Sequence, residues 1–208
     1  MSLTVIDLGL IDYRDALKKQ KNLVGEVASG AADVLILCEH PKTITLGRKF
    51  KEGNLFLPRE EFIRQGFALV EADRGGDVTL HSPGQLVIYP VVDLKRAALG
   101  LKEYLQYLEQ VAVDLLGNFD IVAKGDDGNR GVWINGRKIA SIGIGVSRWV
   151  TYHGMGLNIS TDLKLFNVIR PCGLDIRMTS LTAECNCPVV MSDVKCYVVE
   201  HFRKIFGY

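Results

Sequence analysis

The sequence lacks any long apolar run and any excess of charge of one sign. No stretch of the 208 residues approaches the ~20 apolar residues that cross a bilayer, and acidic residues follow the N-terminus too soon for a secretory signal peptide. Lys and Arg total 25 against 24 for Asp and Glu, which leaves a net charge of +1 and no field to attract nucleic acid. We therefore expect a soluble, cytoplasmic protein with neither nucleic acid nor membrane as a partner.

Internal repeats, low-complexity tracts and Pro/Gly/Ser-rich linkers are also missing. With 48% hydrophobic and 24% charged residues, the composition predicts one compact domain over residues 1–208. The sequence contains no GxxxxGK[ST] loop and no GxGxxG after a strand, so no nucleotide cofactor is expected.

Five cysteines are an odd number in a chain large enough to fold on its own core, which favours a reducing compartment over a disulfide framework. At least one thiol is then free. Cys185 and Cys187, with Cys196 beyond, raise the alternative of a zinc site. Their spacing does not match the usual paired ligands and no histidine lies nearby, so we expect no metal.

The pattern of apolar residues predicts an α+β fold, with a mixed, largely antiparallel sheet and helices packed on it. Strands are expected at Thr4–Leu8, Val34–Cys38, Thr43–Leu46, Ala68–Glu71 and Gln85–Val91, with a strand or two within Trp149–Ser160. Helices are expected from an Asp12 cap to about Ala28, from Pro58 through Arg64, from Leu101 to Gly117, and from a Ser192 cap to the C-terminus.

The clearest local signal is GVWINGRKIASIGIGV, in which Asn135-Gly136 joins two β-rich runs. This pair tolerates positive φ and is typical of a two-residue hairpin turn, so Lys138 starts the returning strand. Lys138 shares strand parity with Ala140, Ile142 and Ile144, which predicts a core-facing amine at the edge of apolar surface. The alternatives are a solvated hairpin lysine, or the opposite parity with Ile139 facing inward.

Four glycine-marked segments are candidate walls of a shared site: RGGDVTLHSPGQ, the hairpin, WVTYHGMGLNIS and IRPCG. They are predicted to be too polar and irregular for core strands. In the last segment Cys172 lies between Pro171 and Gly173, where its thiol is accessible and a nearby cation such as Lys138 favours the thiolate.

Each candidate also has a structural interpretation. Cys172 also matches an ordinary loop residue with no chemical role. His81 and His153 also match histidines whose hydrogen bonds serve only the structure. Arg74 fits a partner of Asp73 or Asp77.

Taken together, the segments resemble the octanoyltransferases of lipoate biosynthesis, the lipoyl(octanoyl) transferases. The resemblance runs through CEHPKTITLGR, RGGDVTLHSPGQLVIYPVVDL, GVWINGRKIASIGI, WVTYHGMGLNIS, FNVIRPCGL and MTSL, in matching order and spacing. It implies the fold shared by biotin and lipoate protein ligases. It also implies transfer of an octanoyl group from acyl carrier protein to lipoyl domains of 2-oxoacid dehydrogenase E2 subunits and of the glycine cleavage H protein.

The resemblance further implies that Cys172 carries the acyl group as a thioester and that Lys138 relays protons. The implied acyl site is lined by Arg74, Gly75, Gly76, Asp77, Val78, Thr79, Leu80, His81, Ser141, Ile142, Gly143, Gly154, Met155 and Gly156, with His153 and Gln85 as candidate supporting residues. Backbone N–H groups at Gly75–Gly76 or Gly143 are candidate oxyanion donors, and Ile142, Met155 and Leu157 are candidate walls for the alkyl chain.

Two positions depart from the family pattern and bear on the size of the acyl pocket: Ser82 stands where Gly is usual, and Gly156 where Ala is usual. Two rival functions remain. One is an ATP-dependent lipoate or biotin ligase on the same fold, which requires no cysteine, and the other is a non-catalytic module that binds an acylated partner.

Overall fold

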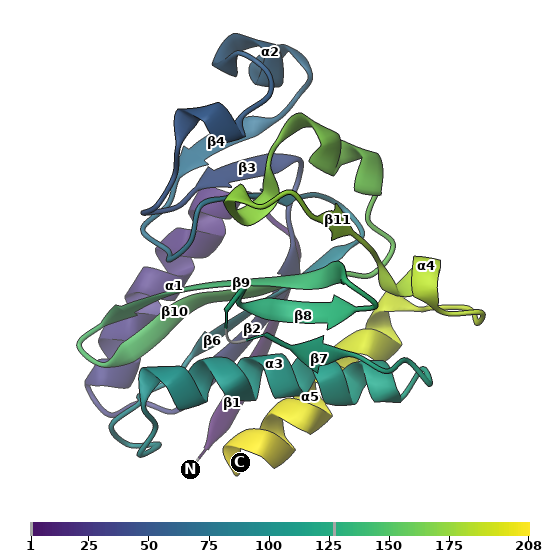
Figure 1. Cartoon of the computed structure of the whole chain (residues 1–208). Helices are drawn as coiled ribbons and strands as arrows, with labels where there is room; N and C mark the ends of the chain where they lie inside the picture. Colours follow the sequence, from purple (N-terminus) through teal and green to yellow (C-terminus); the bar gives the residue numbers. More distant parts are fainter. Residues whose placement is uncertain (1, 127) are drawn as a thin grey trace.

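The computed structural model describes residues 2–126 and 128–208, which form two sheets and their covering helices. The large sheet has the strand order β1-β2-β6-β10-β9-β8-β7, with β11 beside β9, and the small sheet has the order β4-β3-β5 (Figure 1). The strands are β1 (Leu3–Leu10), β2 (Asp33–Glu39), β3 (Thr43–Leu46), β4 (Ala68–Glu71), β5 (Val78–His81), β6 (Gln85–Val91), β7 (Lys124–Gly125), β8 (Gly131–Ile134), β9 (Arg137–Ser147), β10 (Val150–Asn158) and β11 (Arg177–Met178). Only β1–β2, β3–β4 and β9–β11 pair in parallel among the described strands, which confirms the predicted mixed, largely antiparallel α+β fold.

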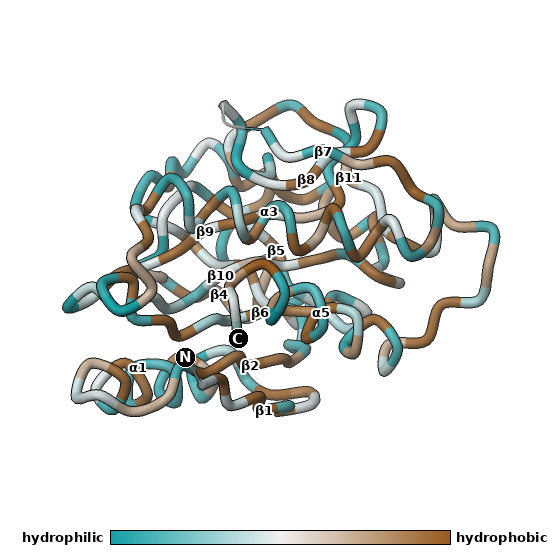
Figure 2. The backbone as a smooth tube through the Cα atoms, turned by 90° about the horizontal axis from the view of Figure 1, so that it is seen from below, coloured by the Kyte–Doolittle hydropathy of each residue, from teal (hydrophilic) through white to brown (hydrophobic). Residues whose placement is uncertain are grey.

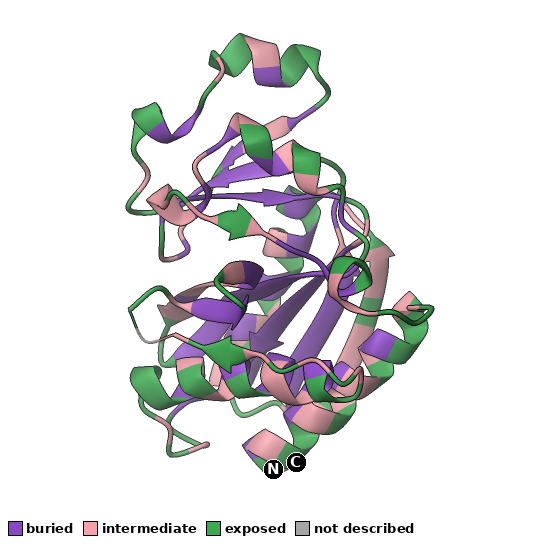
Figure 3. Ribbon diagram, turned by 45° about the vertical axis from the view of Figure 1, so that its right-hand side comes forward, coloured by how far each residue is buried: buried purple, intermediate pink, exposed green. Residues whose placement is uncertain are grey.

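Helices cover both faces of the large sheet. In β2, Val34 and Ile36 pack in the same cluster as buried residues of α1 (Tyr13–Ala28), whereas Leu35 and Leu37 share a cluster with α3 (Leu101–Gly117) and α5 (Met191–Phe206). This period-2 division explains why β2 is buried on both faces, as the central strands of Figure 3 show. Figure 2 shows hydrophobic and hydrophilic residues alternating along α1, as one buried stripe requires. In the described part of the chain, no helix combines the length and apolar character of a membrane span.

The small sheet lies above the large one in Figure 1 and has a separate core. Ile44, Val78 and Leu80 from its strands pack with Phe62 of α2 (Arg59–Arg64) and Phe166 of η2 (Leu163–Val168). The remaining short helices are η1 (Glu52–Asn54), η3 (Pro171–Gly173) and α4 (Leu181–Glu184). Because η3 contacts β5, the chain segment that carries Cys172 lies against the small sheet.

The Asn135-Gly136 hairpin forms as predicted, with φ of 48° and 78° at its two turn residues. Trp133 pairs with Lys138 and Val132 pairs with Ala140, so Ile139 is the extra residue of a β-bulge. The sequence left open whether Lys138 or Ile139 faces inward. Because of the bulge, Lys138, Ile139 and Ala140 are all buried, with exposures of 1%, 0% and 0%.

Three expectations from the sequence are wrong. The polar segments at Val78–His81 and Val150–Asn158 are fully buried strands, because their polar side chains find hydrogen-bond partners within the fold. The last helix begins at Met191 without a side-chain cap, and Ser192 lies inside it. Cys185 and Cys187 form a disulfide, although the odd number of cysteines favoured a chain without disulfides, while Cys38, Cys172 and Cys196 are free thiols.

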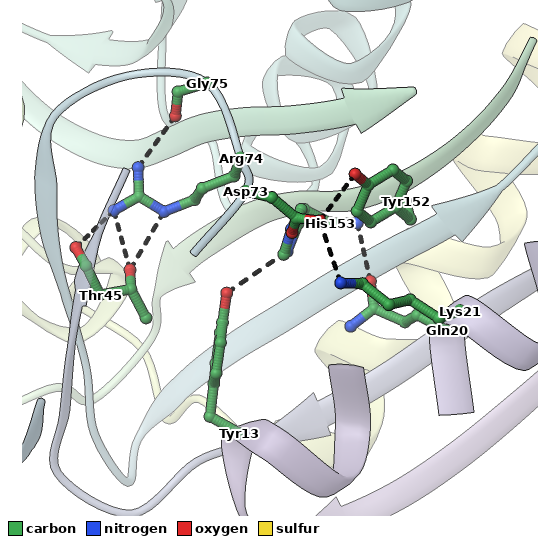
Figure 4. A network of polar contacts seen from close by, with 9 residues as sticks. All are labelled: Tyr13, Gln20, Lys21, Thr45, Asp73, Arg74, Gly75, Tyr152 and His153. Atoms are coloured by element: carbon green, nitrogen blue, oxygen red, sulfur yellow. Dashed lines mark hydrogen bonds and ion pairs between the residues drawn. The ribbon is translucent and has the colours of Figure 1, made fainter. Parts of the chain in front are cut away.

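A buried polar network ties α1 to β10 (Figure 4). His153 Nε2 donates to Asp73 at 2.8 Å, and the Tyr13 hydroxyl lies 3.3 Å from His153 Nδ1. The Gln20 side chain accepts from the His153 backbone N–H at 2.7 Å. Burial lowers the pKa of His153 from 6.5 to about 4, although Asp73 acts in the opposite direction, so the imidazole is neutral in the native protein at neutral pH.

This network predicts a pH-dependent stability. An unfolded histidine takes up a proton below about pH 6.5 whereas native His153 does so only near pH 4, so the free energy of unfolding falls as the pH drops through this window. Chemical denaturation at a series of pH values should show it, and His153→Asn should reduce the slope by up to about 1.4 kcal/mol per pH unit. His201→Gln, outside this network, is the matched control. An unchanged slope in His153→Asn would contradict the assignment.

Candidate active site

Cys172 lies on the η3 turn with its backbone in the left-handed region, at φ 57° and ψ 17°. Few residues other than glycine adopt this conformation without local strain, and such residues cluster at functional sites. The following Gly173 also has positive φ, and a Cβ there would lie 2.9 Å from Asp77 Oδ2. The PCG segment therefore closes a tight turn that leaves the Cys172 side chain partly exposed.

Lys138 reaches this turn from β9. Its Nζ donates to Cys172 Sγ at 3.6 Å and to the Arg130 carbonyl oxygen at 2.7 Å. The amine also lies 5.0 Å from the centre of the Trp133 ring. The alternative of a solvated hairpin lysine is wrong, because the side chain is fixed on three sides and buried.

Gly131 makes the space for the Lys138 side chain. A Cβ on Gly131 would lie 2.5 Å from Lys138 Cε and 2.3 Å from the Ala140 carbonyl oxygen. The first residue of GVWINGRK is thus a glycine because its partner strand carries the buried lysine.

A narrow cavity opens beside Cys172, between β9, β10, β6 and the loop that precedes β5. Its lining comprises Tyr13, Arg74, Gly76, Asp77, Thr79, His81, Gln85, Tyr89, Ser141, Ile142, Gly143, His153, Gly154, Met155, Gly156 and Cys172. The structure thus brings together residues that the sequence spreads over more than half of the chain.

A second, outer cleft shares Cys172 with this inner cavity. Both are lined by Gly76, Asp77, Ile142 and Gly143, and the outer cleft also contains Lys138. The sulfur therefore lies at the boundary between a narrow interior and a wide entrance, where a thiol can be reached from either side.

Most of the predicted lining residues lie at this site, and three of them do not line the inner cavity. Val78 and Leu80 point into the small-sheet core, because alternate residues of a strand face opposite sides and Thr79 and His81 take the cavity side. Gly75 lines the outer cleft instead, and its N–H donates to the Ile144 carbonyl oxygen at 2.8 Å. The candidate oxyanion donors are then Gly76 and Gly143. Leu157, predicted as a channel wall, is part of the large core cluster.

Tyr13 and Tyr89 also line the inner cavity, although no sequence pattern predicted them as site residues. Tyr13 occupies a buried position of the α1 stripe, and Tyr89 lies in an all-buried strand. Nothing in such patterns distinguishes a core tyrosine from one that faces a cavity.

Part of the inner-cavity lining, at His81 and Gln85, is polar but uncharged. His81 Nδ1 lies 2.7 Å from Gln85 Oε1, and burial keeps the pKa of His81 well below its ordinary value of 6.5. A Cβ on Gly156 would lie 2.8 Å from Gln85 Oε1. Gly156, which stands where Ala is usual in the octanoyltransferases, therefore leaves the space that the Gln85 side chain fills.

The amino-acid sequence matches a known protein family over most of its length. The model of the "Lipoyl protein ligase A/B catalytic domain" family matches residues 12–203. The octanoyltransferase of Syntrophobacter fumaroxidans is 42% identical over 97% of this chain and 90% of its own length. The octanoyltransferase of Nitratidesulfovibrio vulgaris (strain DP4) is 44% identical over 98% of this chain and 94% of its own length.

Solved structures agree on the fold. Lipoate-protein ligase A bound with ATP superimposes with a TM-score of 0.83 at 15% identity, covering 100% of this chain and 86% of that one. The biotin protein ligase of Aquifex aeolicus in complex with biotin and ATP superimposes with a TM-score of 0.58 at 11% identity. The match covers 99% of this chain and 70% of that one. These likenesses confirm the predicted ligase-like fold, and at such low identities they extend to the fold alone. The match over residues 12–203, together with relatives above 40% identity along nearly their whole length, shows that the chain belongs to the lipoyl protein ligase A/B catalytic domain family.

Proposed function

We propose that this enzyme transfers an octanoyl group from acyl carrier protein to the acceptor lysine of lipoyl domains, through a thioester on Cys172. The observation that carries the proposal is the 3.6 Å contact between Lys138 Nζ and Cys172 Sγ at the mouth of the inner cavity. The octanoyl group follows from the octanoyltransferases at 42–44% identity. A cavity walled by Ile142 and Met155 offers apolar surface to its alkyl chain.

In the first half-reaction the Cys172 thiolate attacks the carbonyl carbon of the donor thioester. The tetrahedral oxyanion collapses and expels the donor thiolate, which takes a proton from the Lys138 ammonium and leaves as a thiol. One thioester replaces another, so this step needs no nucleotide.

In the second half-reaction the neutral amine of the acceptor lysine attacks the Cys172 thioester. Lys138, now neutral, takes a proton from the attacking nitrogen, and the Cys172 thiolate leaves. The products are an amide and the starting state of the enzyme. Because an amide is more stable than a thioester, this half-reaction drives the transfer.

Lipoyl domains of 2-oxoacid dehydrogenase E2 subunits and of the glycine cleavage H protein are the proposed acceptors. One structural neighbour is an archaeal lipoate protein ligase studied with its E2 lipoyl domain, at a TM-score of 0.76 and 15% identity. The outer cleft supports this proposal, because Cys172 is among its lining residues and two protein substrates could approach the sulfur through it in turn. This order of events requires the donor to leave before the acceptor enters.

With octanoyl-acyl carrier protein and no acceptor, Cys172 should gain the mass of one octanoyl group, because the thioester then has no amine to react with. Intact-protein and peptide mass spectrometry measure this. Cys172→Ala should abolish both the adduct and the transfer. Cys196→Ala, which removes an exposed free thiol, should retain both. A fully active Cys172→Ala enzyme, or turnover that consumes ATP, would refute the scheme and point to a ligase.

Lys138→Ala should lower the transfer rate by roughly 10²- to 10⁴-fold, the usual contribution of a proton-transferring group. Steady-state assays with a lipoyl-domain acceptor measure the effect. Lys18→Ala, an exposed lysine on α1, serves as the control and should be as active as the native enzyme. A Lys138→Ala enzyme with native rates in both half-reactions would remove Lys138 from its proposed role.

A further inference from the structure

Arg74 is a buried cation, and among residues 2–126 and 128–208 its hydrogen-bond acceptors are all neutral. Its side chain is 7% exposed. Nε donates to Thr45 Oγ1 at 3.0 Å, Nη2 to the Thr45 carbonyl oxygen at 2.6 Å, and Nη1 to the Gly75 carbonyl oxygen at 2.9 Å (Figure 4). A buried charge of this kind is costly unless another charge compensates it.

The two carboxylates next to Arg74 in sequence do not supply that compensation as ion pairs. Asp73 points the other way, toward His153, Tyr152 and Lys21 (Figure 4). Asp77 accepts from Asn54 Nδ2 at 2.7 Å and from the Val78 N–H at 2.7 Å. The interpretation of Arg74 as an ion-pair partner of Asp73 or Asp77 is therefore wrong.

Two glycines from separate segments leave room for the Arg74 side chain. A Cβ on Gly47 would lie 2.6 Å from Arg74 Nη1, and one on Gly143 would lie 3.2 Å from Arg74 Cδ. The Arg74 side chain is thus fixed by Thr45 and enclosed by backbone, and it lines the inner cavity together with Cys172.

The charged groups around Cys172 are Arg74 and Asp77, which line the inner cavity, and Lys138, which lines the outer cleft. His81 and His153 are uncharged at neutral pH because burial lowers their pKa values. Arg74 contributes one positive charge and Asp77 one negative charge, and Lys138 adds a second positive charge at the sulfur. A thiolate on Cys172 therefore has two cations beside it, Arg74 in the inner cavity and Lys138 at 3.6 Å.

Further cations lie on the outer side of the sulfur. Lys49, Lys51, Arg130 and Arg170 line the outer cleft. Arg130 pairs with Glu109 and Arg170 pairs with Asp175, while both lysines are exposed. Solvent screens these outer charges, so they act on Cys172 more weakly than a buried cation does.

We propose that Arg74 is the permanent cation of this site, compensating the negative charge of the Cys172 thiolate and then of the tetrahedral oxyanions, while Lys138 moves the proton. The oxyanion part rests on the proposed function. Arginine does not release its proton in proteins, so it keeps its charge in the acyl-enzyme, when Lys138 has given its proton to the departing thiol. Burial lowers the pKa of Arg74, and the negative charges of neighbouring groups, Cys172 among them, act in the opposite direction.

The test is the rate at which iodoacetamide alkylates Cys172 across the neutral pH range, with no acyl donor present. Cys196, an exposed free thiol in the same chain, is the internal reference in peptide mass spectrometry. Arg74→Gln should slow Cys172 about tenfold or more at neutral pH, since one pKa unit changes the thiolate fraction tenfold, and should leave Cys196 unchanged. Arg74→Lys, which retains the charge, should slow the alkylation of Cys172 less than Arg74→Gln does. A folded Arg74→Gln protein with the native rate profile at Cys172 would overturn the proposal.

A second measurement leaves Arg74 in place, in case Arg74→Gln does not fold. In Lys138→Ala, Cys172 should still react faster than Cys196, and its advantage should be larger with anionic iodoacetate than with neutral iodoacetamide. Equal rates for the two thiols with both reagents would show that Arg74 has no influence on the sulfur. Because neither assay needs acyl transfer, failure of the proposed function appears separately, as a missing octanoyl adduct on Cys172.

Discussion

The contact between the Lys138 amine and the Cys172 sulfur is the interaction on which this account depends. The two residues are 34 positions apart in the chain, and their atoms meet at 3.6 Å only because two independent pieces of structure converge. One piece is the β-bulge of β9, which buries Lys138 beside Gly131. The other is the η3 turn, in which Cys172 and Gly173 both adopt positive φ above Asp77.

The two-sheet architecture serves this contact by forming a polar layer between apolar cores. The large sheet buries its apolar residues against α1 on one face and α3 and α5 on the other, and the small sheet has its own cluster. Arg74, His81 and His153 lie where the two sheets meet, and each makes specific hydrogen bonds. These hydrogen bonds hold the side chains in place, and a rigid polar cavity stabilises charge without having to reorganise.

The sequence predicted the parts that depend on local pattern. The Asn135-Gly136 turn, the α1 cap at Asp12 and most strands follow from residue type and spacing, and the glycine-marked segments indicated which parts of the chain converge. The errors share one physical cause: single residues were judged without their partners. Val150–Asn158 is a buried strand because Gln20, Asp73 and Thr179 satisfy its polar groups, and none of these is near it in sequence. Tyr13 and Tyr89 could not be distinguished from ordinary core residues, and the bulge at Ile139 made a simple alternation rule fail at Lys138.

The most direct test of the central claim is a crystal structure of the enzyme after exposure to octanoyl-acyl carrier protein without an acceptor. We expect a thioester on Cys172 Sγ, with the alkyl chain in the inner cavity beside Ile142 and Met155 and the Lys138 amine within hydrogen-bonding distance of the reacting group. An acyl group attached to another residue, or a Lys138 side chain turned away from Cys172 in that state, would contradict it.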